Sequence, residues 1–162
     1  MELKLILSYD RQPEVLQLFT EYINLILEQG DDVKRCLEAQ HYSDEGQELE
    51  EKYGLPHGRL YLACYGEDIA GCVALKRTDD SYCEIKRLYV RPQYRGKYIG
   101  KALVQQVIAD AKHIGYQHMR LDTFPFMDNA IELYKRYGFY VIERYNDNPA
   151  TTAIYMQLDL QP

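Results

Sequence analysis

The sequence predicts an α+β fold, with a mixed, mostly antiparallel, twisted sheet flanked by helices. Two observations lead to this prediction. In the middle of the chain, strand-like segments follow one another with only tight turns between them. Further on, strand-like segments alternate with helical segments that connect them. The length of 162 residues is that of one ordinary domain, so we expect residues 1–162 to form a single domain.

The chain is expected to begin with a strand and two helical regions. Leu3–Ser8 reads as a short strand. Pro13–Glu28 reads as an amphipathic helix, because proline suits the first helical turn and apolar side chains recur at helical spacing on one face. A second, interrupted helical region is expected from Asp31 or Asp32, either of which can cap its start, to Tyr53.

Three strands are expected next. Residues 59–77 read as two strands around the turn Gly66–Asp68. Residues 81–90 read as a third strand, and Pro92 ends it because proline cannot donate a hydrogen bond to a strand ladder. This succession of strands and tight turns favours antiparallel pairing.

Helices and strands then alternate. Gly100–His113 carries apolar side chains on one stripe and ends at a glycine, which is typical of a helix. A short helix is expected at Asn129–Tyr137, where Asn129 with Glu132 three residues later resembles a capping box and Gly138 ends the helix. The remaining strands are expected at residues 117–124, 139–145 and 152–160.

Composition excludes several classes of protein. The net charge of −6 disfavours general nucleic-acid binding, and no apolar run approaches the roughly 20 residues of a membrane span. The N-terminal segment is too short and too acidic for a signal peptide. Four cysteines without a C-x-x-C pair, and scattered histidines, argue against a zinc site or a disulfide framework. We therefore expect a cytoplasmic protein that uses no metal.

A basic turn stands out against the acidic whole. Residues 85–101 contain six basic residues and no acidic one, and they include the glycines of "RPQYRGKYIGKALVQQ" at Arg91–Gln106. A strand, a basic glycine-containing turn and a helix start together outline a phosphate site, because the first amide groups of a helix lack internal partners. The pattern fits neither G-x-x-x-x-G-K-[ST] nor G-x-G-x-x-G. A plain strand-to-helix connection is the alternative.

Two motifs resemble those of the GNAT acetyltransferase superfamily, in the bacterial small-molecule type. "EIKRLYVRPQYRGKYIGKALV" resembles its acetyl-CoA signature, whose core is [QR]-x-x-G-x-[GA], and "NAIELYKRYGF" resembles its second motif. The resemblance implies a GNAT-like fold whose two central strands splay apart. It also implies direct acetyl transfer from acetyl-CoA, the co-substrate, to a primary amine of a small molecule, without a metal or a covalent enzyme intermediate.

The same resemblance implies the cofactor-binding residues. Backbone groups of Leu88, Tyr89 and Val90 would lie beside the thioester and the pantetheine amides. Amides of the turn would hold the pyrophosphate; these residues are Arg95, Gly96, Lys97, Tyr98, Ile99, Gly100 and Lys101.

Two positions depart from the family pattern. Tyr98 stands where the family has glycine; we expect it to be helical already, with its side chain outward at little cost. If the position instead requires a positive φ, a tyrosine costs about 1–2 kcal/mol. Met127 stands where the family often has asparagine, so Asn129 is expected to take over the cap and is counted among the cofactor-binding residues.

Tyr134 and Glu84 are the candidate catalytic residues. Tyr134 matches the family's tyrosine that protonates the departing thiolate; it also lies on an apolar helical stripe, so a core residue is the alternative. By strand alternation Glu84 shares a face with Lys86, Leu88 and Val90, and a carboxylate there could deprotonate the amine directly or through water. A cross-strand ion pair, with water as the base, is the alternative for Glu84.

The acceptor amine is not identified by the sequence. The acidic stretch at residues 44–51 and the loops at 55–59 and 145–150 are expected to shape its pocket. Acidic residues near the mouth would favour a cationic amine, but a solvated helix face explains them equally well. A protein or peptide amine acetyltransferase and a catalytically weak CoA-binding module remain alternatives, and a homodimer is left open.

Overall fold

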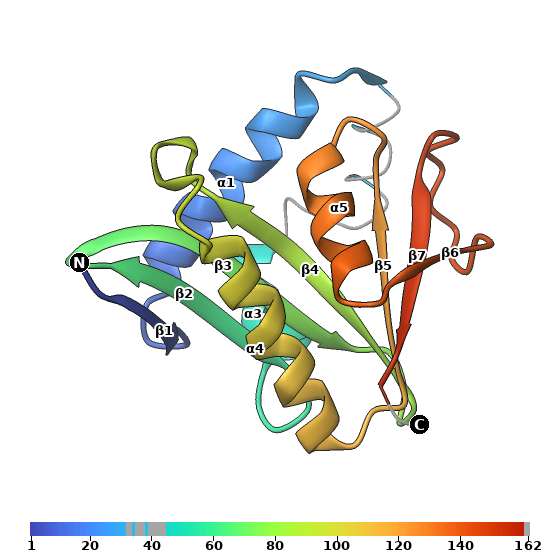
Figure 1. Cartoon of the computed structure of the whole chain (residues 1–162), viewed down its shortest axis with the longest axis horizontal. Helices are drawn as coiled ribbons and strands as arrows, with labels where there is room; N and C mark the ends of the chain where they lie inside the picture. Colours follow the sequence, from blue (N-terminus) through green and yellow to red (C-terminus); the bar gives the residue numbers. More distant parts are fainter. Residues whose placement is uncertain (32–33, 35–37, 39–44, 161–162) are drawn as a thin grey trace.

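The computed structural model describes residues 1–31, 34, 38 and 45–160, and its centre is a seven-stranded sheet (Figure 1). The strand order is β1-β2-β3-β4-β5-β7-β6. Neighbouring strands run antiparallel except β4 and β5, which are parallel. The prediction of a mixed, mostly antiparallel sheet is therefore confirmed. The strands are β1 (Leu3–Leu7), β2 (Arg59–Tyr65), β3 (Asp68–Arg77), β4 (Tyr82–Val90), β5 (His118–Thr123), β6 (Tyr140–Ile142) and β7 (Ile154–Asp159).

Helices cover both faces of the sheet. The helices are α1 (Gln12–Leu27), α3 (Glu45–Tyr53), α4 (Ile99–Ile114) and α5 (Asp128–Arg136), with a short 3-10 turn at Pro92–Tyr94. α4 and α5 lie on one face, where Leu103, Val107 and Tyr134 join the core. α1 and α3 lie on the other face, where Phe19 and Tyr53 pack edge to face over the sheet. Figure 1 shows α4 and α5 together in front of the sheet.

Most expected elements lie within a residue or two of their predicted bounds. The expected strand at 139–145 is shorter, because only Tyr140–Ile142 pairs with β7. Beyond it, the Arg144 guanidinium donates to the Asn146 carbonyl and Tyr145 turns inward, so the backbone leaves the sheet. The expected helical region before residue 45 lies mostly outside the described residues.

A β-bulge interrupts β4. The register shifts between Cys72 and Ala74 of β3, so Val73 lies opposite two residues of β4, Arg87 and Leu88. Arg87 has a φ of 56°, an uncommon value for a residue with a side chain. A bulge of this kind bends its strand and re-aims the side chains that follow it.

The bulge corrects the expected side-chain alternation along β4. Before it, Ile85 packs toward α4, so Glu84 and Lys86 point to the opposite face. After it, Leu88 and Val90 pack toward α4 as well. Glu84 and Lys86 therefore do not share a face with Leu88 and Val90, because the extra residue shifts the alternation by one.

The two parallel strands separate beyond their first residues. β4 and β5 pair only between Tyr82–Glu84 and His118–Arg120. Figure 1 shows the two strands together at one end and diverging toward the other, with α5 in front of the gap. The predicted splay of the central strands is thus present, and it opens the interior of the sheet next to the bulge.

Candidate active site

The turn before α4 presents a row of backbone amides. Gly96 has a φ of 82°, and a Cβ built there would meet no atom within 4 Å. At the start of α4, the first backbone amide that donates to a backbone carbonyl is that of Ala102, which donates to the Tyr98 carbonyl at 3.1 Å. The amide groups from Gly96 to Lys101 therefore have no backbone acceptor among the described residues. Together with the positive end of the α4 dipole they can bind an anion.

Tyr98 is not helical, and this corrects the expectation. It is the N-cap residue of α4, with φ 64° and ψ 20°, in the left-handed region. The chain enters from an extended Arg95 and must turn sharply to begin the helix, which is why the family's glycine suits this position. The tyrosine costs about 1–2 kcal/mol of backbone strain. Its side chain is 78% exposed, so burial does not offset that cost.

A large cleft of about 470 Å³ opens beside this turn, between β4, α1 and α5. Six of the predicted cofactor-binding residues line it: Leu88, Tyr89, Val90, Arg95, Gly100 and Asn129. The sequence did not count the rest of the lining among the cofactor-binding residues, although it marked Met127 as a departure from the family pattern. These residues are Tyr22, Leu25, Gln29, Phe126, Met127, Asp128, Ala130 and Leu133. A mostly apolar cleft that ends at free amides suits a ligand with a flexible arm and a phosphate group.

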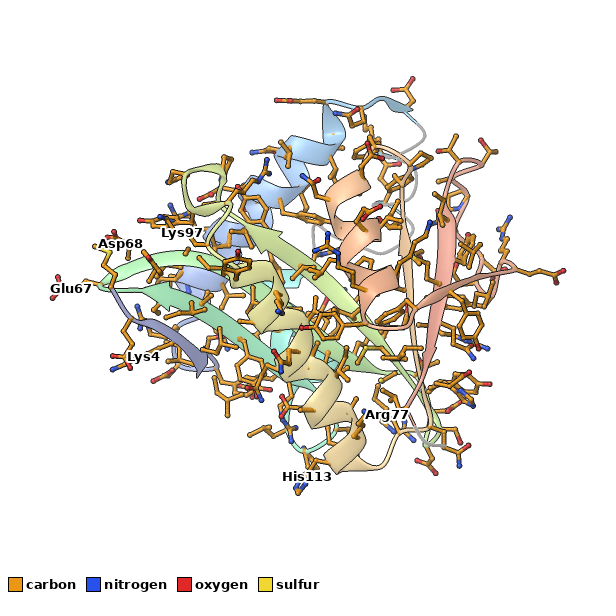
Figure 2. The ribbon with its side chains drawn as sticks, in the orientation of Figure 1. Lys4, Glu67, Asp68, Arg77, Lys97 and His113 are labelled. Atoms are coloured by element: carbon orange, nitrogen blue, oxygen red, sulfur yellow. The ribbon has the colours of Figure 1, made fainter. Side chains whose placement is uncertain are left out.

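The other predicted cofactor residues point their side chains elsewhere. Ile99 is 1% exposed and belongs to the core. The Lys97 ammonium lies 5.3 Å from the centre of the Tyr65 ring, and Figure 2 shows Lys97 at the same edge of the molecule as Asp68. Neither Ile99 nor Lys97 lines the large cleft. Lys101 lines a separate cavity between α4 and α5.

The start of α5 differs from the expected capping box. Its N-cap is Met127, and no side-chain hydrogen bond caps the helix. Asn129 lies one residue inside the helix and lines the large cleft. The N-cap lies two residues before Asn129, the position that the motif indicated. The side-chain amide of Asn129 is thus placed to contact a ligand and not to cap the helix.

A small inner cavity of about 40 Å³ lies where β4 and β5 separate. Its lining is Tyr22, Ile26, Ile85, Lys86, Arg87, Leu88, Leu121, Asp122, Thr123, Phe124, Met127 and Tyr134. Tyr22, Leu88 and Met127 also line the large cleft, so these residues separate the two spaces.

Tyr134 combines features of a core residue and of a site residue. Its side chain is 6% exposed, and its ring centre lies 5.4 Å from that of Phe139. It also lines the inner cavity beside Leu88. Burial raises the pKa of the Tyr134 hydroxyl above its ordinary value, so the group stays protonated at neutral pH and can donate a proton.

Glu84 belongs to a buried polar network. The Tyr145 hydroxyl donates to Oε2 of Glu84 at 2.8 Å, and the Lys86 ammonium lies 3.3 Å from the same oxygen. Lys86 is also 4.0 Å from Oδ1 of Asp122, whose other oxygen accepts a hydrogen bond from Asn146 at 3.0 Å. Glu84 itself is 8% exposed and lines neither the large cleft nor the inner cavity.

The network fixes the charges around the inner cavity. Burial alone would lower the pKa of Lys86, but the carboxylates of Asp122 and Glu84 outweigh it and raise that pKa. Burial, with Glu84 and Asp122 nearby, raises the pKa of the Tyr145 hydroxyl, which stays neutral. Lys86 is therefore a cation held between two carboxylates at the edge of the inner cavity.

The sequence did not single out Asp122, and it marked Tyr145 only as the first residue of a loop expected to shape the acceptor pocket. Asp122 lies near the end of β5, and the register that brings it toward Lys86 is a parallel pairing that local patterns do not show. Tyr145 contacts Glu84 across 61 positions of sequence. β5 alternates the buried Met119 and Leu121 with polar residues, so no local signal distinguished Asp122.

The expected acceptor-pocket segments are only partly involved. Glu48, Glu50 and Glu51 of the acidic stretch and the loop at 55–59 line neither the large cleft nor the inner cavity, and Asp44 lies outside the described residues. From the loop at 145–150, Tyr145 and Asn146 reach Glu84 and Asp122. Among the described residues, no group of three or more His, Cys, Asp and Glu side chains is placed to hold a metal ion, and no helix is long and apolar enough to cross a membrane.

The chain is similar to known acetyltransferases. A family model described as the acetyltransferase (GNAT) family matches residues 26–139. An uncharacterized N-acetyltransferase from Schizosaccharomyces pombe is 40% identical over 126 residues, which cover 76% of this chain and 77% of that protein.

Solved structures share the fold. A GNAT-family acetyltransferase from Staphylococcus aureus has a TM-score of 0.77 at 22% identity, covering 99% of this chain and 100% of that chain. A GNAT-family acetyltransferase from Elizabethkingia anophelis, solved with acetyl-CoA bound, has a TM-score of 0.56 at 28% identity, covering 70% of this chain and 82% of that chain.

These similarities and the geometry agree. The family match spans more than half of the chain and includes the basic turn, the bulged strand and α5. The yeast relative supports the same assignment over three quarters of the chain. The chain therefore belongs to the GNAT family of acetyltransferases.

Proposed function

We propose that the protein transfers an acetyl group directly from acetyl-CoA to a primary amine of a small molecule. One observation carries this proposal. Leu88 lines both the large cleft and the inner cavity, at the point where β4 and β5 separate. A thioester lying in the large cleft would therefore place its acetyl group beside Leu88, within reach of an amine in the inner cavity.

The large cleft would hold the cofactor along its length. The amides from Gly96 to Lys101, with the Arg95 guanidinium at the cleft wall, would bind the pyrophosphate. The backbone of β4 from Leu88 to Val90 would run beside the pantetheine arm. Asn129 offers a side-chain amide on the opposite wall.

The reaction needs two proton transfers. The amine attacks the thioester carbonyl carbon as a neutral nucleophile, a C–N bond forms, and the C–S bond breaks. The Tyr134 hydroxyl would give its proton to the departing thiolate, which burial of Tyr134 favours by keeping that hydroxyl protonated. Glu84 is our candidate for receiving the proton of the amine; because Glu84 does not line the inner cavity, that proton would travel through water or through the Lys86–Asp122 side of the network.

The inner cavity supports a small acceptor. Its volume of about 40 Å³ admits an amino group with little else attached. Arg87, Phe124 and Tyr134 around it are each less than 9% exposed, so this part of its wall is buried. A peptide would have to place a lysine side chain in this small space, whereas a small amine needs only one end inside.

Acetyl-CoA turnover against a matched panel of acceptors tests the proposal. The panel contains small amines, amino acids, peptides with a free N-terminus and lysine peptides with a blocked N-terminus, and release of the CoA thiol is followed. We expect kcat/KM for the best small amine to exceed that for the best peptide by at least about tenfold, equal to about 1.4 kcal/mol of transition-state stabilisation. A peptide that outperforms every small amine would favour the peptide acetyltransferase. Tight acetyl-CoA binding without turnover of any acceptor would favour the CoA-binding module.

A further inference from the structure

A carboxylate lies in the inner cavity, beside the point where acetyl transfer is proposed. Asp122 is the only acidic residue among the described residues that line this cavity, and Glu84 does not line it. Tyr134 and Leu88 line the same space. Asp122 therefore shares a small cavity with the proposed proton donor and with the residue expected beside the thioester, where it can meet the amino group of an acceptor directly.

The two carboxylates of the buried network differ in how fully they are engaged. Oε2 of Glu84 accepts a hydrogen bond from the Tyr145 hydroxyl at 2.8 Å and lies 3.3 Å from the Lys86 ammonium. Asp122, whose side chain is 9% exposed, accepts one hydrogen bond, from the Asn146 amide to Oδ2 at 3.0 Å. Its Oδ1 lies 4.0 Å from the Lys86 ammonium and accepts no hydrogen bond from any residue in the described ranges. Oδ1 of Asp122 can therefore accept a hydrogen bond from a ligand.

The charges of the inner cavity favour a neutral amine over an ammonium ion. Lys86 and Arg87 line the cavity together with Asp122. Burial lowers the pKa of Lys86, but Asp122 and Glu84 outweigh it and raise that pKa, so Lys86 stays charged. Two fixed cations disfavour a third positive charge nearby, and they lower the pKa of an ammonium group that binds beside them. An acceptor that arrives as an ammonium ion should therefore lose a proton in this cavity.

The other titratable groups around Asp122 are not suited to take that proton. Burial is the main cause that raises the pKa of the Tyr134 and Tyr145 hydroxyls, so both stay protonated. Arg120, two residues earlier on β5, is a permanent cation whose guanidinium carbon lies 4.9 Å from the centre of the Tyr145 ring. Asp122 and Glu84 remain as proton acceptors among the described residues, and of these Asp122 lines the cavity.

We propose that Asp122 binds the amino group of the acceptor through Oδ1 and takes its first proton. The neutral amine then attacks the thioester carbonyl carbon, so that a C–N bond forms and the C–S bond breaks. The Tyr134 hydroxyl gives its proton to the departing thiolate, and the second proton of the nitrogen restores Tyr134 through water. Asp122 returns its proton to water once the products leave.

This inference rests on the proposed function and names the first proton acceptor within it. Glu84 can receive the proton only after Asp122, through the Lys86 ammonium that lies between the two carboxylates. The acceptor it implies is a primary alkylamine that is protonated in solution and is neutralised in the inner cavity.

Acceptor amines of graded basicity test the proposal. The series contains primary alkylamines of similar size whose ammonium pKa values fall from about 10, near the lysine value, to below the assay pH. Asp122→Asn keeps the shape of the side chain but cannot take a proton, whereas Asp122→Glu keeps a carboxylate. Asp159→Asn is a matched control, because it removes a carboxylate of β7 that lines neither the large cleft nor the inner cavity.

The loss of activity should depend on the basicity of the acceptor. Asp122→Asn should lower kcat/KM for the most basic amines by about 10²–10⁴, the usual contribution of a general base. For amines that are neutral at the assay pH the loss should shrink to within about tenfold, because no proton has to leave before attack. Asp122→Glu should retain more activity toward basic amines than Asp122→Asn does, and Asp159→Asn should match wild type.

Melting temperature and acetyl-CoA affinity are measured on the same preparations. Both should stay near their wild-type values in Asp122→Asn, because Lys86 keeps its closer partner Glu84 at 3.3 Å. These two measurements separate a change in proton transfer from a change in folding or in cofactor binding.

The remaining outcomes overturn this inference or the proposed function. If Asp122→Asn acetylates basic amines within about threefold of wild type, Asp122 is not the proton acceptor, while the proposed function stands. Equal losses for basic and weakly basic amines, in Asp122→Asn or in a folded Asp122→Glu variant, would indicate a structural role and would also refute the inference. If wild type acetylates no amine of any kind, the proposed function itself fails.

Discussion

Replacing Tyr134 with phenylalanine removes one hydroxyl group from the wall of the inner cavity and little else. The ring stays in place against Phe139, since phenylalanine fills almost the same volume. The hydroxyl forms no hydrogen bond with any residue that the structure describes, so its removal leaves no protein partner unsatisfied there. Thermal stability and acetyl-CoA affinity should therefore remain near those of wild type.

The rate should respond quite differently. If Tyr134 protonates the departing thiolate, its loss should lower the rate of acetyl transfer by about 10²–10⁴, or roughly 3–5 kcal/mol of transition-state stabilisation. Because burial raises the pKa of this hydroxyl, wild type should not lose activity through its deprotonation up to about pH 10, the ordinary tyrosine value. Tyr134→Ala, by contrast, should cost about 3–5 kcal/mol of stability, as an emptied aromatic site does.

Single-turnover kinetics, with enzyme in excess over acetyl-CoA, is the suitable assay, because product release can limit kcat and hide the chemical step. Melting temperature and acetyl-CoA affinity are measured on the same preparations. A Tyr134→Phe variant that transfers acetyl at the wild-type single-turnover rate would refute the general-acid role. Tyr134 would then be a core residue alone.

Three further predictions concern other parts of the structure. Glu84→Gln should lower kcat/KM by about 10²–10⁴ if Glu84 is the general base; a variant within about threefold of wild type would assign the proton to water or to another group. Gly100→Ala should fit the protein without its ligand, since the new Cβ would lie 3.6 Å from Leu133 Cδ2, an ordinary contact distance, and should stabilise α4 by up to about 1 kcal/mol. Yet it should weaken acetyl-CoA binding by narrowing the large cleft, and unchanged affinity in calorimetry would argue against a ligand close to that backbone. Nη2 of Arg91 lies 2.7 Å from Oε2 of Glu21, and the hydrogen bond from Arg91 holds the pKa of the Glu21 carboxyl below its ordinary value. Glu21→Gln removes this ion pair. Because the pKa of Glu21 is lower in the folded than in the unfolded chain, where it is about 4.3, ionised Glu21 stabilises the fold above that pH. Denaturation at pH 7 should therefore show a free energy of unfolding for wild type that exceeds that of Glu21→Gln by up to about 1 kcal/mol, and the difference should be lost as pH falls through the folded pKa. A difference that persists in acid would contradict the ion pair.

Local sequence signals were sufficient for most of the architecture. Pro92 and Gly115 mark the end of β4 and of α4, and the tight turn at Gly66 and Asp68 joins β2 to β3. These residues act through their own backbone preferences, which are visible without tertiary contacts. The motif resemblance predicted cofactor contacts at Leu88 and Gly100, and both residues line the large cleft.

Non-local geometry accounts for what the sequence missed. The bulge at Arg87 shifts side-chain alternation in β4, and no local pattern announces it, so Glu84 was assigned to the wrong face. The conformation of Tyr98 is imposed by the turn into α4 against the tyrosine's own preference. Tyr145 and Asp122 join Glu84 through strands distant in sequence, and such contacts depend on pairing that only the folded chain defines.

The most direct test of the whole account is a crystal structure of the protein with acetyl-CoA. We predict the pyrophosphate at the amides between Gly96 and Lys101, and the pantetheine arm in the large cleft along Leu88–Val90. The thioester sulfur should lie within hydrogen-bonding distance of the Tyr134 hydroxyl. A pyrophosphate bound away from this turn, or a thioester outside the gap between β4 and β5, would contradict the account.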